Sequence, residues 1–121
     1  MRLLPVGLCV AVLAVGAITK VSAAPAYWIA ELEITDAAKL KEFGTASNPV
    51  VAKYGGVFLS RRNKPEAALG TPPSSVTIIQ FESMEKARAY LNSPELKALE
   101  ALRNQAARFH AYLVPGGDSA Q

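Results

Sequence analysis

Two adjacent glycines, Gly55 and Gly56, constrain the fold of this chain more than any other feature. The residues before them carry apolar side chains near helical spacing, and Val57–Arg62 after them alternates as a strand does. Glycine adopts the left-handed backbone conformation that commonly ends a helix, at little steric cost. The pair therefore predicts a reversal from helix to strand near the middle of the chain.

Three other segments also have the composition and alternation of strands. They are Ala26–Ile34, Val76–Phe81 and Phe109–Val114. The connection 63–75 contains three of the eight prolines of the chain and is longer than a tight hairpin needs. We expect it to form an arm at the edge of a sheet.

Capping residues mark the starts of the predicted helices. Asp36 precedes the first helix and Ser83 precedes the second, and both side chains can accept hydrogen bonds from free backbone amides. Asn48-Pro49 predicts a kink or a split in the first helix, because proline has no amide hydrogen to donate. Asn92-Ser93-Pro94 predicts a break and restart in the second, with proline at the first helical position.

The predicted order is β-α-β-β-α-β, which indicates an α+β protein with a ferredoxin-like fold. In this fold a four-stranded antiparallel sheet has both helices on one face. The side chains expected beneath the helices are Trp28, Leu32, Phe58, Ile79 and Phe81.

The opposite face of the predicted sheet is also apolar. It would carry Ile29, Val57, Leu59, Val76 and Ile78. Soluble monomers rarely expose a contiguous apolar patch of this kind. A second copy placed sheet to sheet about a two-fold axis would cover it, so we expect a homodimer with a barrel-like interior.

The N-terminal segment has the order of a secretory signal peptide. An apolar run, residues 3–18, lies between Arg2 and Lys20 and is followed by small residues up to Ala24. The run is shorter than the ~20 residues that span a bilayer comfortably, which favours a cleaved signal over an uncleaved anchor. We expect cleavage after Ala23 and a periplasmic or secreted product. The predicted organisation is a signal (1–23), one domain (24–117) and a short tail (118–121).

Removal of this signal changes the charge balance of the chain. The full sequence has 13 Lys and Arg against 10 Asp and Glu; losing Arg2 and Lys20 leaves 11 against 10, a net charge of +1. A nucleic-acid partner or an anionic membrane requires a concentrated basic face, and neither is predicted. Cys9 would leave with the signal, so the mature domain would fold without disulfides.

Several motifs together resemble a known bacterial family, the domains of unknown function numbered 1330. They are Tyr27-Trp28-Ile29, Lys53-Tyr54-Gly55-Gly56, Arg61 ahead of Lys64-Pro65-Glu66, and Asn92-Ser93-Pro94-Glu95. The resemblance runs from about Ala26 to Gly116. It implies a dimeric α+β barrel, in a superfamily that includes cofactor-free monooxygenases, muconolactone isomerases and haem-dependent peroxidase-like enzymes. The chain departs from the family pattern at Val57, where a basic residue is frequent, and at Arg62 and Asn63, where glycines are common.

Strand alternation places four polar or aromatic side chains toward the barrel interior: Tyr27, Glu31, Arg61 and Gln80. They are the candidate ligand-binding residues. Arg61 would hold an anionic or enolate oxygen, and Glu31, with its pKa raised by burial, would move a proton. Alternatively, Glu31 and Arg61 pair with each other or lie in water at the barrel mouth.

His110 is the single histidine and has neither a second histidine nor a mature cysteine to accompany it. No metal site, catalytic Cys/His pair or cofactor is therefore predicted. Three functions stay open: an exported homodimer that binds a small apolar or anionic molecule between its sheets, a cofactor-independent monooxygenase- or isomerase-type enzyme using Glu31 and Arg61, and a dimerisation module with a filled interior.

Overall fold

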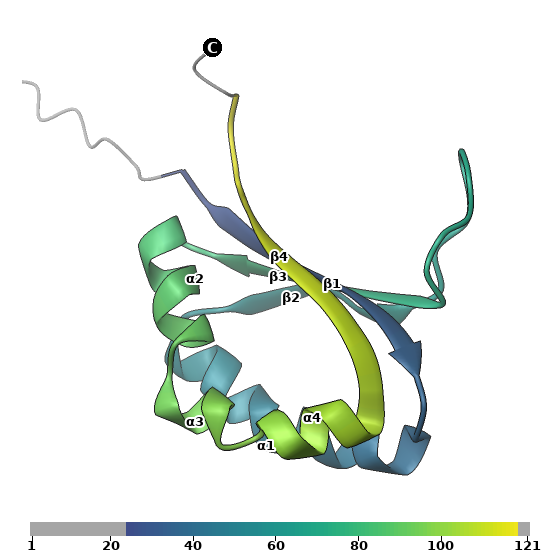
Figure 1. Ribbon diagram of the computed structural model, residues 1–121. Helices are drawn as coiled ribbons and strands as arrows, with labels where there is room; N and C mark the ends of the chain where they lie inside the picture. Colours follow the sequence, from purple (N-terminus) through teal and green to yellow (C-terminus); the bar gives the residue numbers. More distant parts are fainter. Residues whose placement is uncertain (1–23, 119–121) are drawn as a thin grey trace, which may run out of the picture.

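Four antiparallel strands form one sheet in the order β2-β3-β1-β4 in the computed structural model, which describes residues 24–118. The predicted signal, residues 1–23, and the end of the predicted tail, residues 119–121, lie outside the described residues. All helices lie on one side of the sheet (Figure 1). The elements are, in chain order, β1 (Ala26–Ile34), α1 (Ala37–Lys53), β2 (Val57–Asn63), β3 (Ser75–Phe81), α2 (Met84–Leu91), α3 (Pro94–Lys97), α4 (Glu100–Ala106) and β4 (Ala107–Pro115). The predicted ferredoxin-like α+β fold is confirmed.

The central strand β3 follows the predicted alternation along its whole length, and β1 follows it from Ala26 to Leu32. Their registers run without interruption from Ala26 opposite Phe81 to Leu32 opposite Ser75. Every second side chain in these two ranges is buried under the helices, whereas Ile34 at the end of β1 is 45% exposed. Trp28, Ile79 and Phe81 are therefore core residues, as alternation predicts.

The buried core lies between this face of the sheet and the helices. Tyr90 of α2 is at its centre, 5.2 Å from the Phe81 ring and 6.2 Å from the Trp28 ring between centroids. Its side chain is only 2% exposed. Helix α1 buries Leu40, Phe43, Val50 and Val51 against the same layer.

Helix α1 continues through Pro49, so the possible split of this helix does not occur. Proline removes one backbone hydrogen bond, but burial of residues on both sides of it keeps the helix on the sheet. The expected caps are present: Asp36 Oδ1 accepts from Lys39 N at 3.1 Å, and Ser83 Oγ accepts from Lys86 N at 3.2 Å.

The C-terminal helical region breaks where the sequence predicts. Ser93 Oγ accepts a hydrogen bond from Leu96 N at 3.2 Å, and Pro94 takes the first turn of α3. The restarted segment is itself divided into α3 and α4 rather than being one helix through Ala106. No helix within residues 24–118 is long and apolar enough to cross a membrane.

The glycine pair makes the predicted reversal, but the two glycines serve different purposes. Gly55 has a φ of +78°, the left-handed conformation expected after a helix. At Gly56 the constraint is space, because a Cβ atom would lie 2.7 Å from Val51 Cγ1 and 2.9 Å from Phe81 Cε1. The turn therefore requires glycine at position 55 for its backbone conformation and glycine at position 56 for its close approach to the core.

The edge strand β2 departs from regular pairing with β3 twice. Its register shifts once between Phe58 and Ser60 and again between Ser60 and Asn63. Each shift adds one residue to β2, as β-bulges do. Arg62 in the second irregularity has a φ of +52°, an uncommon conformation for a residue with a side chain.

Residues 64–74 form the expected arm, which extends beyond the edge of the sheet (Figure 1). Leu69 on this arm is 96% exposed. The two ends of the described chain meet at the opposite side, where Gly116 N donates a 2.7 Å hydrogen bond to the carbonyl oxygen of Pro25.

Candidate functional site

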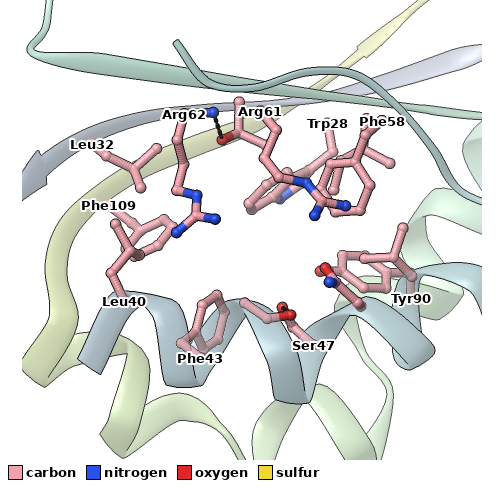
Figure 2. A pocket seen from close by; sticks show the side chains of 15 residues that line it. Trp28, Leu32, Leu40, Phe43, Ser47, Phe58, Arg61, Arg62, Tyr90 and Phe109 are labelled. Atoms are coloured by element: carbon pink, nitrogen blue, oxygen red, sulfur yellow. Dashed lines mark hydrogen bonds between the residues drawn. The ribbon is translucent and has the colours of Figure 1, made fainter. Parts of the chain in front are cut away.

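The bulges of β2 turn two arginines toward the helices. Ser60 pairs with Ile78 and Asn63 with Val76, so Arg61 and Arg62 both lie opposite Thr77, whose side chain is buried on the helix side. Arg62 N donates a 3.0 Å hydrogen bond to Thr77 Oγ1, which holds the bulge in place. Figure 2 shows both guanidinium groups pointing into the space between the sheet and α1.

This arrangement corrects the face predicted for Arg61. Simple alternation along β2 puts Arg61 on the face away from the helices, but one extra residue reverses the parity of everything that follows it. Arg61 consequently does not share a face with Glu31. The predicted convergence of these two side chains does not occur within the protomer, and the alternative in which they pair with each other is not found among residues 24–118.

A pocket between α1 and the sheet, which we call the helix–sheet pocket, receives the two arginines. Its cavity has a volume of about 40 Å³. Aromatic side chains provide much of the lining: Trp28, Phe43, Phe58, Tyr90 and Phe109. The Phe43 and Phe109 rings meet edge to face at 5.7 Å, so the wall at that end is built from residues of α1 and β4.

Arg61 is held by an aromatic ring. Its guanidinium carbon lies 3.7 Å from the centroid of the Phe58 ring, within the range of a cation–π interaction. This contact orients the charged group without neutralising it. Arg62 lies beside α1, and its guanidinium comes within 4 Å of the position of a Cβ atom on Gly44. A larger residue at Gly44 would therefore crowd this guanidinium.

Neither guanidinium has an acidic partner within residues 24–118. The ion pairs in this part of the chain are Lys53–Glu95, Lys86–Glu82 and Arg103–Glu100. Two neighbouring cations that line a pocket without a carboxylate provide an attractive position for an anion.

One residue that lines the pocket has a buried polar group without a partner. Trp28 is 8% exposed, and its Nε1–H is buried without a hydrogen-bond acceptor among the described residues. A buried donor without an acceptor is costly, and such groups are uncommon in native structures. Ser47, in contrast, lines the pocket with its hydroxyl donating to Gly44 O at 3.4 Å.

Tyr90 closes the pocket at the α2 end as a neutral side chain. Burial raises the pKa of its hydroxyl to about 12, against a smaller lowering effect of Arg103. The side chains that line the pocket include no carboxylate and no imidazole. Within residues 24–118, no group of three His, Cys, Asp or Glu side chains could hold a metal ion.

The other predicted site residues, Tyr27, Glu31 and Gln80, lie on the opposite side of the sheet, which we call the open face. Tyr27 pairs with Gln80 across β1 and β3, and Glu31 pairs with His110 across β1 and β4. Burial, and next the nearby Glu31 carboxylate, raises the pKa of the Tyr112 hydroxyl on this face. Glu31 thus neighbours Tyr112 and His110 rather than Arg61.

Sequence reasoning did not identify the pocket residues Arg62 and Trp28 as functional candidates. Arg62 carries a usable signal, because the resemblance to the family implies glycine at this position and glycine is the residue that favours a positive φ. Trp28 carries no such signal: alternation places it in the core, which is correct, and says nothing about its indole hydrogen.

A model of the family described as "Domain of unknown function (DUF1330)" matches residues 25–117. No curated protein sequence gives a significant match. Among solved structures, a protein of unknown function from Rhodopseudomonas palustris, RPA0582, is similar with a TM-score of 0.62 and 16% identity, over 79% of this chain and 85% of that one.

Two further solved structures have the same fold. SnoaB, a cofactor-independent oxygenase from Streptomyces nogalater, is 14% identical with a TM-score of 0.58, over 81% of this chain and 98% of that one. A dimeric ferredoxin-like protein of unknown function from Thermobifida fusca is 16% identical with a TM-score of 0.53, over 77% of this chain and 92% of that one. At these identities the likeness concerns the fold.

Proposed function

This chain belongs to the DUF1330 family, a family described without a function, and we propose that it is an exported homodimer that binds a small anionic molecule in the helix–sheet pocket. The observation that carries the proposal is the pair of guanidinium groups, Arg61 and Arg62, which line an aromatic pocket without a carboxylate partner within residues 24–118. The site is therefore placed inside one protomer rather than between the sheets of two.

The electrostatics of the pocket favour an anion over a neutral ligand. Arg61 and Arg62 give the lining of the pocket a net positive charge, and an anion is attracted to it. Arginine binds carboxylates through two parallel N–H donors, so the pair also offers directional recognition. The Phe58 ring restricts Arg61 in advance, which lowers the entropy lost on binding.

The same lining favours binding over acid–base catalysis. General acid–base chemistry needs a group that titrates near neutral pH, usually a carboxylate or an imidazole. The pocket is lined by neither, and its tyrosine has a pKa of about 12. An oxygenase or isomerase that uses Glu31 together with Arg61 is not supported, because the two side chains lie on opposite faces of the sheet.

The open face supports the proposed homodimer. Val57, which pairs with Gln80 of this face, is 61% exposed, and the half-buried Ile29 and Ile78 pair with each other across β1 and β3; Leu59 of β2 is 54% exposed. A second sheet would cover these apolar side chains. The dimeric ferredoxin-like protein from Thermobifida fusca has the same fold, which supports this assembly. Light scattering coupled to size-exclusion chromatography should give twice the monomer mass, and Ile78→Glu should give a monomer.

Export rests on the order of the first 23 residues, a basic start, an apolar run and small residues at the expected cleavage position. Mass spectrometry of protein recovered from the exported fraction should give the mass of a chain that begins at Ala24. A mass that includes residues 1–23 would contradict the proposed cleavage.

Binding can be followed through Trp28, the single tryptophan of the chain, because it lines the pocket. We expect carboxylates to change its fluorescence and the corresponding neutral amides to leave it unchanged. Replacing both pocket arginines, Arg61→Gln with Arg62→Gln, should weaken carboxylate binding at least tenfold, since each lost charged hydrogen bond contributes about 1.5–3 kcal/mol.

Arg88→Gln is the matched control, because Arg88 is an exposed arginine of α2 that does not line the pocket. It should bind carboxylates as the original protein does. Equal loss of binding in this control, or equal binding of acids and amides by the original protein, would contradict the proposal. The double variant should stay dimeric, because both arginines lie away from the open face.

A further inference from the structure

We infer that the ligand of the helix–sheet pocket is a short-chain oxo acid, with its carboxylate at Arg61 and Arg62 and its oxo oxygen on the indole N–H of Trp28. The inference rests on the proposed anion site and adds the size and the second functional group of the ligand. Three separate observations carry it: the volume of the cavity, the position of the charges and the unpartnered donor.

The cavity limits the body of the ligand to a few atoms. A volume of about 40 Å³ compares with roughly 10–15 Å³ for one water-sized group, so about three such groups fit. The wall beside Phe43 is fixed by the edge-to-face contact with Phe109, and the wall at Tyr90 by its contact with Phe81. An aromatic ring or a six-carbon chain would have to displace these packed side chains.

The charges set the orientation of such a molecule. Arg61 and Arg62 are exposed, whereas Trp28 and Tyr90 are buried, so the guanidinium groups lie at the solvent side of the pocket and the indole lies inside it. A carboxylate at the arginines therefore directs the rest of the molecule inward, toward an apolar lining. In Figure 2 the guanidinium group of Arg61 lies beside the Phe58 ring, and both guanidinium groups lie above Phe43 of α1.

The indole of Trp28 specifies what the inner part should carry. Nε1–H is a donor only, and it is buried without an acceptor among the described residues. A purely aliphatic body would leave this donor unsatisfied, whereas an oxo oxygen would accept its hydrogen. The donor is far more buried than the arginines, so the oxo group belongs on the inward side of the carboxylate.

Paired ligands test this directly on protein expressed from the full-length chain. Pyruvate is compared with propionate and 2-oxobutyrate with butyrate, while hexanoate and 2-naphthoate test the size limit. The single tryptophan gives a single indole resonance in a ¹⁵N NMR spectrum. We expect both oxo acids to move this resonance to lower field and to bind roughly fivefold more tightly than their parent acids, the gain of about one hydrogen bond. Hexanoate and 2-naphthoate should bind more weakly than propionate.

Trp28→Phe should remove the preference for oxo acids and keep the binding of propionate. Binding to this variant is measured from the NMR resonances of the backbone amides of α1. If this variant does not fold, the indole resonance of the original protein still decides, because parent acids should not shift it as oxo acids do. Tighter binding of 2-naphthoate than of propionate, with dependence on Arg61 and Arg62, would overturn this inference and leave the anion site standing. Failure of every carboxylate to bind would overturn both.

Discussion

Strands β3 and β2 are neighbours in one sheet, but they use their residues differently. β3 lies between two partners, alternates buried and half-buried side chains along its whole length, and sends Ile79 and Phe81 into the core. β2 is at the edge, shifts register twice, and has no side chain that is fully buried. The central strand β3 contributes buried side chains that stabilise the fold. The irregular edge strand β2 contributes little to the core and positions two arginines at the helix–sheet pocket.

The largest contrast should appear when one phenylalanine is removed from each strand. Phe81→Ala should lower the free energy of unfolding by about 3–5 kcal/mol, because the ring is fully buried beneath Tyr90. Phe58→Ala should cost only about 1–2 kcal/mol, because its ring is half-buried. Urea denaturation measures both values. Similar losses in the two variants would contradict the division of roles between the strands.

Phe58→Ala should also weaken carboxylate binding, whereas Phe81→Ala should not, because only Phe58 lines the pocket. Without the Phe58 ring, Arg61 loses the contact that orients it, so carboxylate affinity should fall severalfold. Fluorescence titration of Trp28 in the folded variant gives the affinity, and an unchanged value would mean that the stacked ring does not prepare Arg61 for a ligand.

The loss of stability at alkaline pH tests the burial of the hydroxyl of Tyr90, whose ring packs against Phe81 of β3. Burial raises the pKa of Tyr90 from its usual value of 10.0 to about 12 in the folded protein. The neutral hydroxyl therefore stabilises the fold fully below pH 10, and this contribution is lost as the pH rises from 10 to 12, amounting to about 2–3 kcal/mol. Urea denaturation at pH 9 and pH 11.5 should show the loss in the original protein. The extra loss should be absent in Tyr90→Phe.

The smallest expected effect concerns the bulge itself and has opposite signs for stability and binding. Arg62→Gly should raise the free energy of unfolding by roughly 0.5–1 kcal/mol, because glycine accepts the φ of +52° without steric cost. Carboxylate binding should weaken in the same variant. Arg61→Gly is the control, since Arg61 does not have a positive φ, and it should lose both stability and binding. A stability gain in both variants would remove the role assigned to the backbone at Arg62.

The same contrast between strands explains what sequence alone could predict. β1 and β3 alternate cleanly, so the faces of Trp28, Leu32, Ile79 and Phe81 follow from counting by two. In β2 alternation assigns a face to each residue, but it does not reveal the two extra residues that the register shifts add to the strand. Strict alternation predicts the correct face for Phe58 and the wrong face for Arg61, because the first register shift of β2 lies between them.

The pocket is less predictable than the fold for a related reason. It depends on a bulge, a positive φ and an unpartnered indole, and each is a departure from regular structure rather than an expression of it. Local propensity predicts regular elements well, and functional sites are where it most often fails. Here Arg62 and Asn63, where the resemblance implies glycines, lie at the second register shift of β2.

If the chain is exported as proposed, the link between the two ends of the domain bears on the timing of that export. Pro25, whose carbonyl accepts the hydrogen bond from Gly116 N, is two residues beyond the proposed cleavage point after Ala23. β1 begins at the next residue and takes a central position between β3 and β4. A signal protease needs an extended chain around its cleavage site. Once β1 has paired with its neighbours, fewer residues after Ala23 are free to extend into the protease. Under the proposed export, translocation, cleavage and completion of the sheet should therefore occur in that order, with β1 pairing only on a chain already released from its signal.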